Sequence, residues 1–341
     1  MQNLRVAIVG FGFMGRMHYR CWNQVSGGGV VAICDSNPNI VTDTARAVGN
    51  IEGAAETVDF DRLSVYTDFD KMLAAEKIDV VSITLPTYMH PEFTEKALNS
   101  GCHVLCEKPM ALDVAGCERM ITAAEKSHKQ LLIGHCVRFW PEYAKTKEIV
   151  DSGQYGRLIA ASFRRLGTAP TWGAQDWFAD EQRSGGMVLD LHIHDTDYVQ
   201  YLLGMPKAIS SFAARRPHGG IPHIVTQYLY DDDSVVTAEG GWVMTPSFGF
   251  EMSFNLVLEK ASIIYDCTRQ PAFRVCPAQG DPFTPEILPG DGYSQQIEYF
   301  VRQLNGENLP QVTTPRQSCA SVRIVEAEIQ SAKNGQKVIL K

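Results

Sequence analysis

The chain has 341 residues, of which 45% are hydrophobic and 21% are charged, and its formal net charge at pH 7 is −8. A chain of this length exceeds what one hydrophobic core ordinarily supports, so we expect two domains. The acidic balance and the lack of a Lys- and Arg-rich run argue against a nucleic-acid-binding protein. No apolar run approaches the roughly 18 residues of a membrane-spanning helix, and no export signal precedes the first predicted strand. We therefore expect a cytoplasmic protein.

The nine cysteines fit the same compartment. Their number is odd, they form no Cys-x-x-Cys motif, and several lie within apolar segments that are typical of strands. These features favour buried, reduced thiols over a disulfide framework or a structural zinc site.

A glycine-rich turn follows the first predicted strand, residues 5–10. It reads Gly10-x-Gly12-x-x-Gly15 and leads into a segment that can be helical to about residue 25. Between a strand and a helix, this spacing indicates the phosphate-binding turn of a dinucleotide-binding fold. Gly10 permits the tight turn, Gly12 lets the backbone approach the pyrophosphate, and Gly15 allows close packing of helix on strand.

The second predicted strand, residues 30–35, ends in Asp35, which lies 20 residues beyond Gly15. A carboxylate at this spacing accepts hydrogen bonds from the adenosine ribose hydroxyls and repels a 2′-phosphate. Ser36 and Asn37 follow, so no arginine stands next to Asp35 to neutralise such a phosphate. The sequence therefore favours NAD over NADP.

Strands and helices continue to alternate to about residue 135. This alternation predicts a parallel, doubly wound sheet in an N-terminal domain, residues 1–135. The acidic connection 50–61 is expected to be a solvated surface. Further strands are expected at 64–66, 79–84, 103–107 and 131–135, and helices at 68–76, 91–100 and 114–127.

Two strand ends in this domain carry polar residues. Glu107 and Lys108 follow the strand at 103–107, and the turn 85–91 follows the strand at 79–84. The carboxyl ends of parallel strands are where open α/β sheets bind ligands, so we expect both stretches to line a cofactor groove. A solvated Glu–Lys pair in a loop is the alternative for Glu107 and Lys108.

In residues 136–341 the regular alternation of strands and helices stops, which predicts an α+β domain with a mostly antiparallel sheet for substrate binding and oligomerisation. Its exposed sheet face could cover a ligand or pair with another subunit, so we expect a homodimer or homotetramer. A C-terminal segment of this domain could pack back on the first domain. Residues 231–233 form a hairpin turn, and the Pro-rich stretch 271–289 is expected to be irregular. Helices are expected at 141–152, 186–203, 293–304 and 316–334, and strands at 158–167, 208–215, 224–230, 234–242, 250–259, 262–266 and 338–340.

The predicted helix 186–203 carries a second chemical cluster. Asp190, His194 and Asp197 lie at i, i+4 and i+7 and so share one face. An aspartate one turn before a histidine can orient the imidazole and raise its basicity, which suits a general base. A metal site is disfavoured, because His192 and His194 lie about 200° apart on a helix. A purely structural Asp–His pair that closes the helix against the sheet is the other alternative.

Four more residues are candidates for substrate binding. Trp172, Trp177 and Tyr293 could contact a sugar ring, although core packing is the commoner role of a tryptophan. Arg138 lies just past the last strand of the first domain, where an interdomain ion pair is an equally good interpretation.

These motifs together resemble the family of glucose–fructose oxidoreductase, inositol dehydrogenase and MocA. The pairing of Glu-Lys-Pro with the later Asp-x-x-x-His is their most specific element. The resemblance covers nearly the whole chain and implies a Rossmann domain that binds NAD, followed by a substrate domain. The matching stretches are 10–15 with Asp35, 85–91, 106–109, 138–139, 184–186, Asp190-x-x-x-His194 and 331–338.

The resemblance also implies roles for individual residues. In the family, residues matching Lys108, Asp190 and His194 meet at the substrate, and the one matching Glu107 lies on the ribose and nicotinamide side of the cofactor. The family often has glycine where Met187 and His192 stand here, which leaves the shape of the pocket open. The expected cofactor-binding residues are Gly10, Gly12, Phe13, Met14, Gly15, Asp35, Leu85, Pro86, Thr87, His90, Glu107 and Lys108.

We therefore expect an NAD-dependent dehydrogenase, similar to inositol 2-dehydrogenase, that oxidises a secondary alcohol of a cyclitol, sugar or sugar derivative. His194 would accept the hydroxyl proton, Asp190 would orient the imidazole, and Lys108 would hold the reacting oxygen. The alternative is a redox-neutral enzyme that retains NAD and cleaves a glycoside or rearranges a sugar. A nucleotide-sensing protein without catalysis is disfavoured, because all three of these residues are present.

Overall fold

The computed structural model describes residues 3–43, 58–171, 174–216 and 220–340. Most of the acidic connection 50–61 lies outside these residues. The chain packs as two compact units, each described here by itself. The first unit comprises Met1–Cys136, Trp172–Trp177 and Gly290–Cys319, and the second comprises Val137–Thr171, Phe178–Pro289 and Ala320–Lys341.

The first unit is built on a parallel sheet of six strands in the order β3-β2-β1-β4-β5-β6. The order reverses between β1 and β4, and such a switch point is where doubly wound sheets bind ligands at the carboxyl ends of their strands. This arrangement confirms the predicted fold of the N-terminal domain. The strands are β1 (Leu4–Val9), β2 (Gly28–Cys34), β3 (Ser64–Tyr66), β4 (Val80–Ile83), β5 (His103–Glu107) and β6 (Leu131–Gly134).

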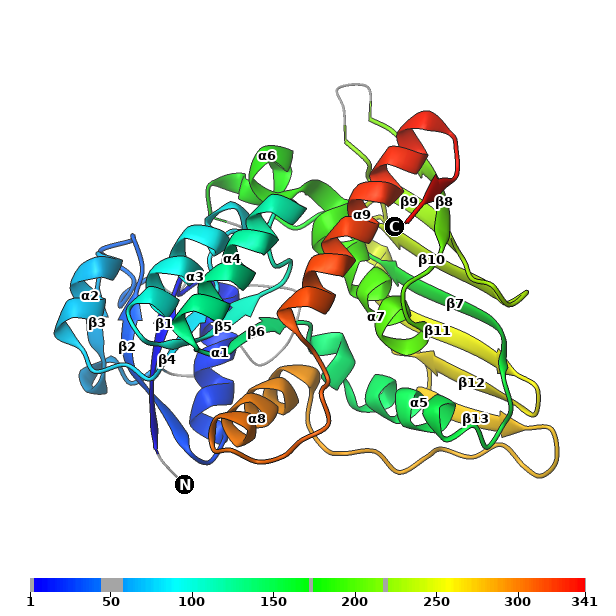
Figure 1. The fold of residues 1–341 in the computed structure, drawn as a ribbon, viewed down its shortest axis with the longest axis horizontal. Helices are drawn as coiled ribbons and strands as arrows, with labels where there is room; N and C mark the ends of the chain where they lie inside the picture. Colours follow the sequence, from blue (N-terminus) through cyan, green and yellow to red (C-terminus); the bar gives the residue numbers. More distant parts are fainter. Residues whose placement is uncertain (1–2, 44–57, 172–173, 217–219, 341) are drawn as a thin grey trace. The chain divides into compact units, whose positions relative to one another are not determined.

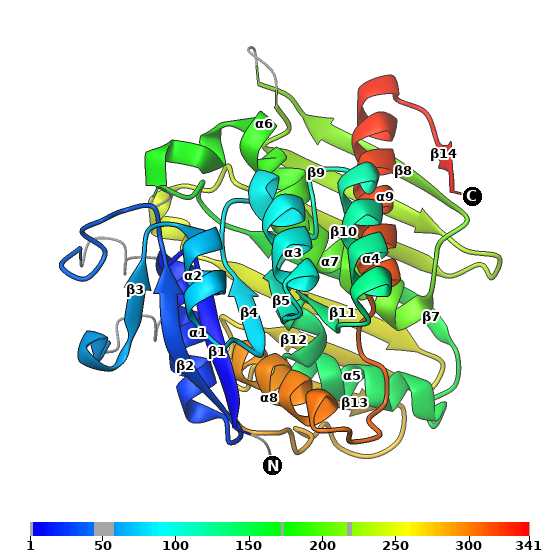
Figure 2. The same cartoon turned by 60° about the vertical axis from the view of Figure 1, so that its left-hand side comes forward.

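Helices cover both faces of this sheet, which is why β4 and β6 are buried along their whole length. Helices α3 and α4 pack side by side on one face, and α1 packs with α8 on the other (Figures 1 and 2). Right-handed crossovers that run in opposite directions from β1 and from β4 require this division. The helices are α1 (Phe13–Gln24), α2 (Phe69–Ala75), α3 (His90–Asn99), α4 (Val114–Ser127) and α8 (Gly292–Leu304).

The second unit is built on an eight-stranded sheet in the order β13-β12-β11-β7-β10-β9-β8-β14. Its pairs are antiparallel except for β7 and β10, which run parallel, so the predicted α+β class is confirmed. The strands are β7 (Leu158–Leu166), β8 (Ala208–Ala214), β9 (His223–Leu229), β10 (Val235–Gly241), β11 (Glu251–Leu258), β12 (Ala261–Asp266), β13 (Phe273–Pro277) and β14 (Val338–Ile339).

One of these strands corrects the sequence analysis. Strand β13 lies inside the stretch 271–289 that was predicted to be irregular. Phe273 and Val275 are buried at alternate positions, and the strand pairs with β12 along its length. Five residues among prolines and glycines are too few to show a period of two, so pairing with a long neighbour decides the structure.

Helices cover one face of the second sheet and leave the other face open (Figure 1). Between helices and sheet lies an aromatic core in which Tyr143 meets Tyr198 and Phe254 edge to face, with ring centroids 4.7 and 4.8 Å apart. The helices of this part of the chain are α5 (Pro141–Ser152), α6 (Glu181–Ser184), α7 (Ile193–Leu203) and α9 (Pro315–Asn334), the last of which begins within the segment assigned to the first unit.

The predicted helix 186–203 is also corrected. Residues Val188–His192 form a π-helical turn, and only then does α7 begin. This wide turn places the His192 ring on β10 at Gly240, where a Cβ atom would lie only 2.6 Å from Nδ1 of the imidazole. A π-turn holds one more residue than an α-helical turn, so the i, i+4 argument for Asp190 and His194 does not apply across it.

Candidate functional site

The glycine turn of the first unit is shaped to admit a ligand backbone. Gly10 has a φ of +86°, which favours glycine, and a Cβ atom at Gly15 would lie 2.2 Å from the Gly10 carbonyl oxygen. At Gly12, by contrast, a Cβ atom would meet no other atom within 4 Å. Gly12 is the N-cap of α1, and no side chain caps this helix. The open cradle and the uncapped N–H groups fit the pyrophosphate of a dinucleotide.

Asp35 lies beside this turn and is nearly buried. Its Oδ2 accepts a hydrogen bond from the Phe11 N–H at 2.7 Å, and its Oδ1 accepts one from the Asn37 N–H at 2.8 Å. Arg16 lies near enough for its charge to interact with that of Asp35, stacks on the Phe11 ring, and donates to the Asp43 carbonyl. Arg16 is thus a cation near Asp35 that the residues following Asp35 in the sequence do not reveal.

Glu107, at the end of β5, is the centre of a buried network. Its Oε1 lies 2.9 Å from Nε2 of His18, and Nδ1 of the same ring lies 2.6 Å from the Ser82 hydroxyl. The Trp22 indole N–H donates to that hydroxyl at 3.3 Å. We assign the donors so that Trp22 donates to Ser82, Ser82 to His18, and His18 to Glu107. With this assignment every group in the hydrogen-bond series has a partner of the right kind.

The network keeps Glu107 ionised. Burial alone raises the pKa of this carboxyl, but the hydrogen bond from His18 and the charge of Lys108 outweigh burial, so the pKa lies below its ordinary value. The other oxygen, Oε2, accepts the backbone N–H of Lys108 at 3.2 Å. Gly134 on β6 leaves room for the carboxylate, since a Cβ atom there would lie 3.0 Å from Oε1. Lys108 itself is half-buried.

The sequence analysis missed His18, Ser82 and Trp22. A signal existed in α1, where positions 15, 18 and 22 share the helix face that packs on the sheet. A histidine on a buried face needs a polar partner, so His18 indicated a buried acceptor without identifying it.

The second-unit candidates divide into two groups. Asp190 is nearly buried in the π-turn, and His194 is partly exposed in the first turn of α7. Asp197, predicted to share their face, instead forms a two-bond ion pair with Arg138 at 2.7 and 2.8 Å, and this pair is fully buried. Both partners belong to the second unit, so this ion pair of Arg138 lies within that unit.

The remaining candidates are placed as follows. Trp172 lies outside the described residues. Trp177 is half-buried in the 3-10 helix Ala174–Ala179, and Tyr293 is nearly buried in the first turn of α8. Their contact with a substrate stays a prediction.

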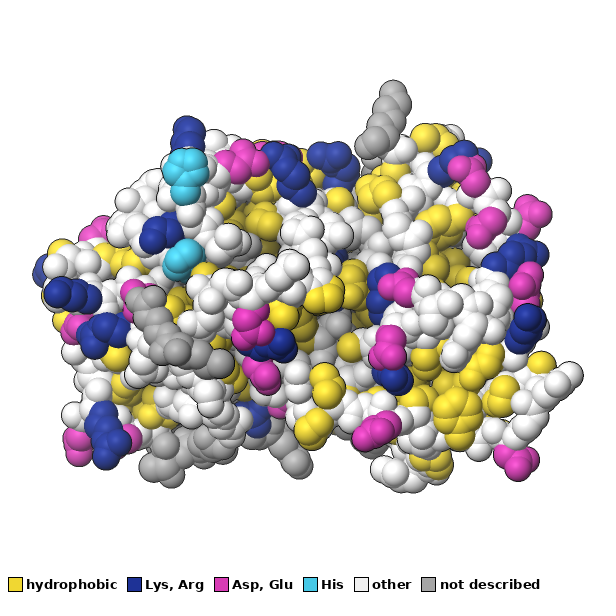
Figure 3. All heavy atoms as spheres, turned by 60° about the horizontal axis from the view of Figure 1, so that its bottom comes forward, with side chains coloured by type: hydrophobic (Ala, Val, Ile, Leu, Met, Phe, Trp, Pro, Cys, Tyr) yellow, Lys and Arg dark blue, Asp and Glu magenta, His cyan; other side chains and the backbone are white. Residues whose placement is uncertain are grey.

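The described residues contain no group of three or more His, Cys, Asp or Glu side chains that could hold a metal ion. Within the same part of the chain, no helix is both long and apolar enough to span a membrane. Lys and Arg side chains are interspersed with Asp and Glu on the face drawn in Figure 3, so this face carries no single basic field.

The Glu107 network predicts a pH-dependent contribution to stability. The folded pKa lies below the ordinary value of 4.5, so the ionised form stabilises the fold above that pH, and this stability is lost as the pH falls through the folded pKa. We expect Glu107→Gln to lower the free energy of unfolding by about 1–3 kcal/mol near neutral pH. The loss should shrink as the pH falls below 4.5 and through the folded pKa.

Urea unfolding of both proteins across this pH range measures the difference. Glu118→Gln, on the exposed side of α4, is the matched control and should show little change. A loss at Glu107 that is equally large at every pH would contradict the lowered pKa.

Comparison with known proteins agrees with these features. The oxidoreductase family with an NAD-binding Rossmann fold matches residues 4–135, and the GFO/IDH/MocA C-terminal domain matches residues 143–264. The D-glucoside 3-dehydrogenase of Escherichia coli K12 is 29% identical, with coverage of 99% of this chain and 97% of that protein. The inositol 2-dehydrogenase of Arthrobacter sp. FB24 is 27% identical, with coverage of 100% and 97%.

Among solved structures, the aldose-aldose oxidoreductase of Caulobacter crescentus superposes with a TM-score of 0.83 at 23% identity, covering 99% of this chain and all of that one. This likeness supports the fold. The two family matches fall on the two halves of the chain, and the first includes both the glycine turn and the Glu107 network. The chain is therefore an oxidoreductase of the glucose–fructose oxidoreductase, inositol dehydrogenase and MocA family.

Proposed function

We propose that this chain is an NAD-dependent dehydrogenase that oxidises a secondary alcohol of a cyclitol, sugar or sugar derivative, in the manner of inositol 2-dehydrogenase. The observation that carries the proposal is the end of β5, where a buried, ionised Glu107 anchors the backbone of the half-buried Lys108. Two relatives that match along their whole length are dehydrogenases of a glucoside and of inositol, which supports this substrate class.

His194, Asp190 and Lys108 have different roles in the proposed reaction. Bound NAD would accept a hydride at its nicotinamide ring. His194 accepts the hydroxyl proton as the carbon–oxygen bond becomes a carbonyl, and Asp190 orients the imidazole. The Lys108 ammonium holds the reacting oxygen and stabilises the negative charge that develops on it.

Arg138 takes a different role in this proposal from the one predicted. Its guanidinium is engaged by Asp197, which stands one turn after His194 on α7. We assign to Arg138 the positioning of α7 rather than contact with substrate. Trp172, Trp177 and Tyr293 remain candidates for contact with a sugar ring.

We further propose that the cofactor is NAD rather than NADP. Each oxygen of a carboxylate can accept more than one hydrogen bond, so Asp35 suits ribose hydroxyls as well as its backbone partners, and its charge opposes a phosphate. Arg16, the nearby cation, is already held by the Asp43 carbonyl and the Phe11 ring.

A second copy of this chain is proposed to cover the open sheet face of the second unit. The pairing register of strands β8, β9, β10, β7 and β11 places one residue of each in a single row across the sheet: Phe212, Val225, Glu239, Arg164 and Ser253. In this row Phe212 is 72% exposed, and its neighbour Val225 is also exposed. Exposed apolar side chains on a broad face indicate an interface.

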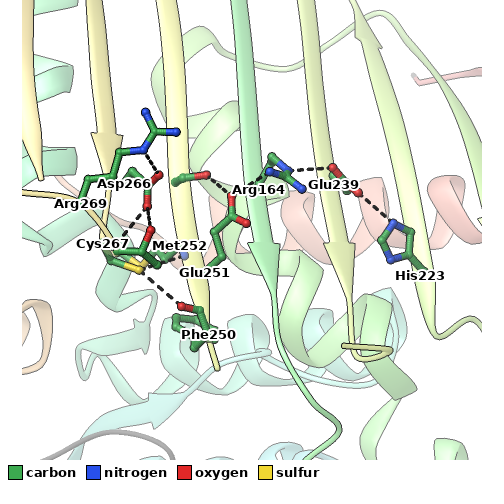
Figure 4. Close-up of polar contacts among 11 residues, drawn as sticks. Arg164, His223, Glu239, Phe250, Glu251, Met252, Asp266, Cys267 and Arg269 are labelled. Atoms are coloured by element: carbon green, nitrogen blue, oxygen red, sulfur yellow. Dashed lines mark hydrogen bonds and ion pairs between the residues drawn. The ribbon is translucent and has the colours of Figure 1, made fainter. Parts of the chain in front are cut away.

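Charges on the same face suit a second copy. Arg164 bridges Glu239 at 2.9 Å and Glu251 at 3.0 Å, and His223 contacts Glu239 at 3.0 Å (Figure 4). A two-fold axis would bring this mixed row against the same row in reverse, so that cations meet carboxylates. The assembly is a homodimer, or such a pair within a homotetramer.

Loss of activity in two variants tests the proposed reaction. With NAD and a panel of cyclitols and sugars, we expect Lys108→Ala and His194→Ala to lower kcat about 10²- to 10⁴-fold. Lys129→Ala, a lysine of the first unit with no proposed role, is the control. Wild-type turnover in Lys108→Ala or His194→Ala would contradict the assigned role. Cofactor that survives dialysis, with turnover but no net NADH, would favour the redox-neutral alternative.

Substitution of Asp35 tests the cofactor assignment. Removing the carboxylate in Asp35→Ser should weaken NAD binding and reduce the discrimination against NADP, because the repulsion of the 2′-phosphate is lost. We expect the ratio of the two dissociation constants to change about tenfold, measured by fluorescence titration. Tighter binding of NADP than of NAD by the unchanged protein would show that the interpretation of Asp35 is wrong.

The mass of the protein in solution, measured by light scattering during size-exclusion chromatography, tests whether a second copy covers this face. Val235→Glu and Val257→Glu place a charge on the open sheet face and should shift the protein toward the monomer. Val65→Glu, the same substitution at an exposed valine of the first unit, should leave the mass unchanged. A monomeric wild-type protein would refute the proposed interface.

A further inference from the structure

His90 occupies an unusual position at the start of α3. The ring is 1% exposed, and both of its nitrogens lie against backbone carbonyl oxygens. Nδ1 is 2.8 Å from the Pro109 oxygen, and Nε2 is 2.8 Å from the Leu85 oxygen. Carbonyl oxygens only accept hydrogen bonds, so the ring serves these contacts one at a time when neutral and together when protonated.

The two carbonyls belong to two different turns. Leu85 lies in the turn that follows β4, and Pro109 comes directly after Lys108 in the turn that follows β5. Strands β4 and β5 are parallel neighbours, with Ile83 opposite Cys106. The His90 ring therefore joins two adjacent turns at the carboxyl edge of the sheet, where a doubly wound fold presents its ligand-binding residues.

Lys108 is thereby held on both sides. Before it in the sequence, the Glu107 carboxylate is fixed by His18, and after it, the Pro109 carbonyl is fixed by His90. Small errors in the position of a reacting group are costly, since a displacement of about 1 Å can lower a rate about 10²-fold. A half-buried lysine between two anchored residues meets this requirement.

We propose that His90 is a positioning residue rather than the cofactor ligand predicted from the sequence. Its Nδ1 fixes the turn that carries Lys108, and its Nε2 fixes the turn after β4. The inference rests on the proposed function, because it assumes that Lys108 holds the reacting oxygen and that the turn after β4 contacts the cofactor. Both nitrogens of this buried ring face backbone carbonyl oxygens, so neither is directed at a ligand.

Two conservative variants separate the two contacts. The amide of asparagine reaches the place of Nδ1, and the amide of glutamine reaches the place of Nε2. We expect His90→Asn to keep kcat within about threefold and to weaken NAD binding several-fold, because only the turn after β4 loosens. His90→Gln should show the reverse, with NAD affinity nearly unchanged and kcat lowered about 10- to 100-fold.

His90→Leu removes both contacts and should lose both properties. His128→Asn, the same substitution at an exposed histidine with a φ of 54°, is the matched control, since asparagine tolerates this conformation. All assays are run well below the unfolding temperature of each variant. Variants that differ from wild type only in thermal stability would reduce His90 to a structural role and overturn the proposal.

A measurement on the cofactor-free protein separates this proposal from the proposed function. The rate at which a small acylating reagent modifies the Lys108 amine is followed by mass spectrometry of the peptide. We expect His90→Gln and His90→Leu to label several-fold faster than wild type, and His90→Asn to label like wild type. If this labelling pattern appears but the wild-type protein turns over none of the substrates, the positioning role of His90 is supported and the proposed function is refuted. Equal labelling in all variants would overturn the proposal.

Discussion

The buried carboxylate of Glu107 is the interaction on which the first unit's site depends. An ionised group in a protein interior is tolerated only when its charge is paired and its lone pairs are used. Here three elements contribute to that condition, since His18 comes from α1, Ser82 from β4, and the Lys108 amide follows β5. The same contacts that make the carboxylate tolerable also fix the backbone from which Lys108 extends. The contacts that stabilise the buried carboxylate and those that place the Lys108 backbone are therefore the same.

In the second unit, two arginines pair with buried carboxylates. Arg165 pairs with Asp195 at 2.9 and 3.0 Å, and Arg138 pairs with Asp197, so two buried ion pairs hold α7 at positions two residues apart in its N-terminal half. Removing one partner of such a pair leaves an uncompensated charge, which commonly costs about 3–5 kcal/mol. The helix that carries His194 is thus held against the sheet by contacts that tolerate little displacement.

Local signals in the sequence were sufficient for much of this structure. The glycine spacing, the acid at position 35 and the alternation of strands with helices predicted the parallel sheet, because each depends on neighbouring residues. What failed depends on packing across long separations. Nothing near Arg138 indicates that its partner stands 59 residues later, and nothing in the helical period announces a π-turn. Strand β13 exists because β12 pairs with it.

The π-turn shows why the helical period does not set the spacing of Asp190 and His194, the proposed catalytic pair. Its width is matched to β10, where Gly240 leaves the space that His192 fills, and any larger residue would meet the imidazole. Asp190 lies within that turn and His194 just after it, so their separation is set by how the turn packs on the sheet. The His192 ring is therefore part of what determines how Asp190 is presented.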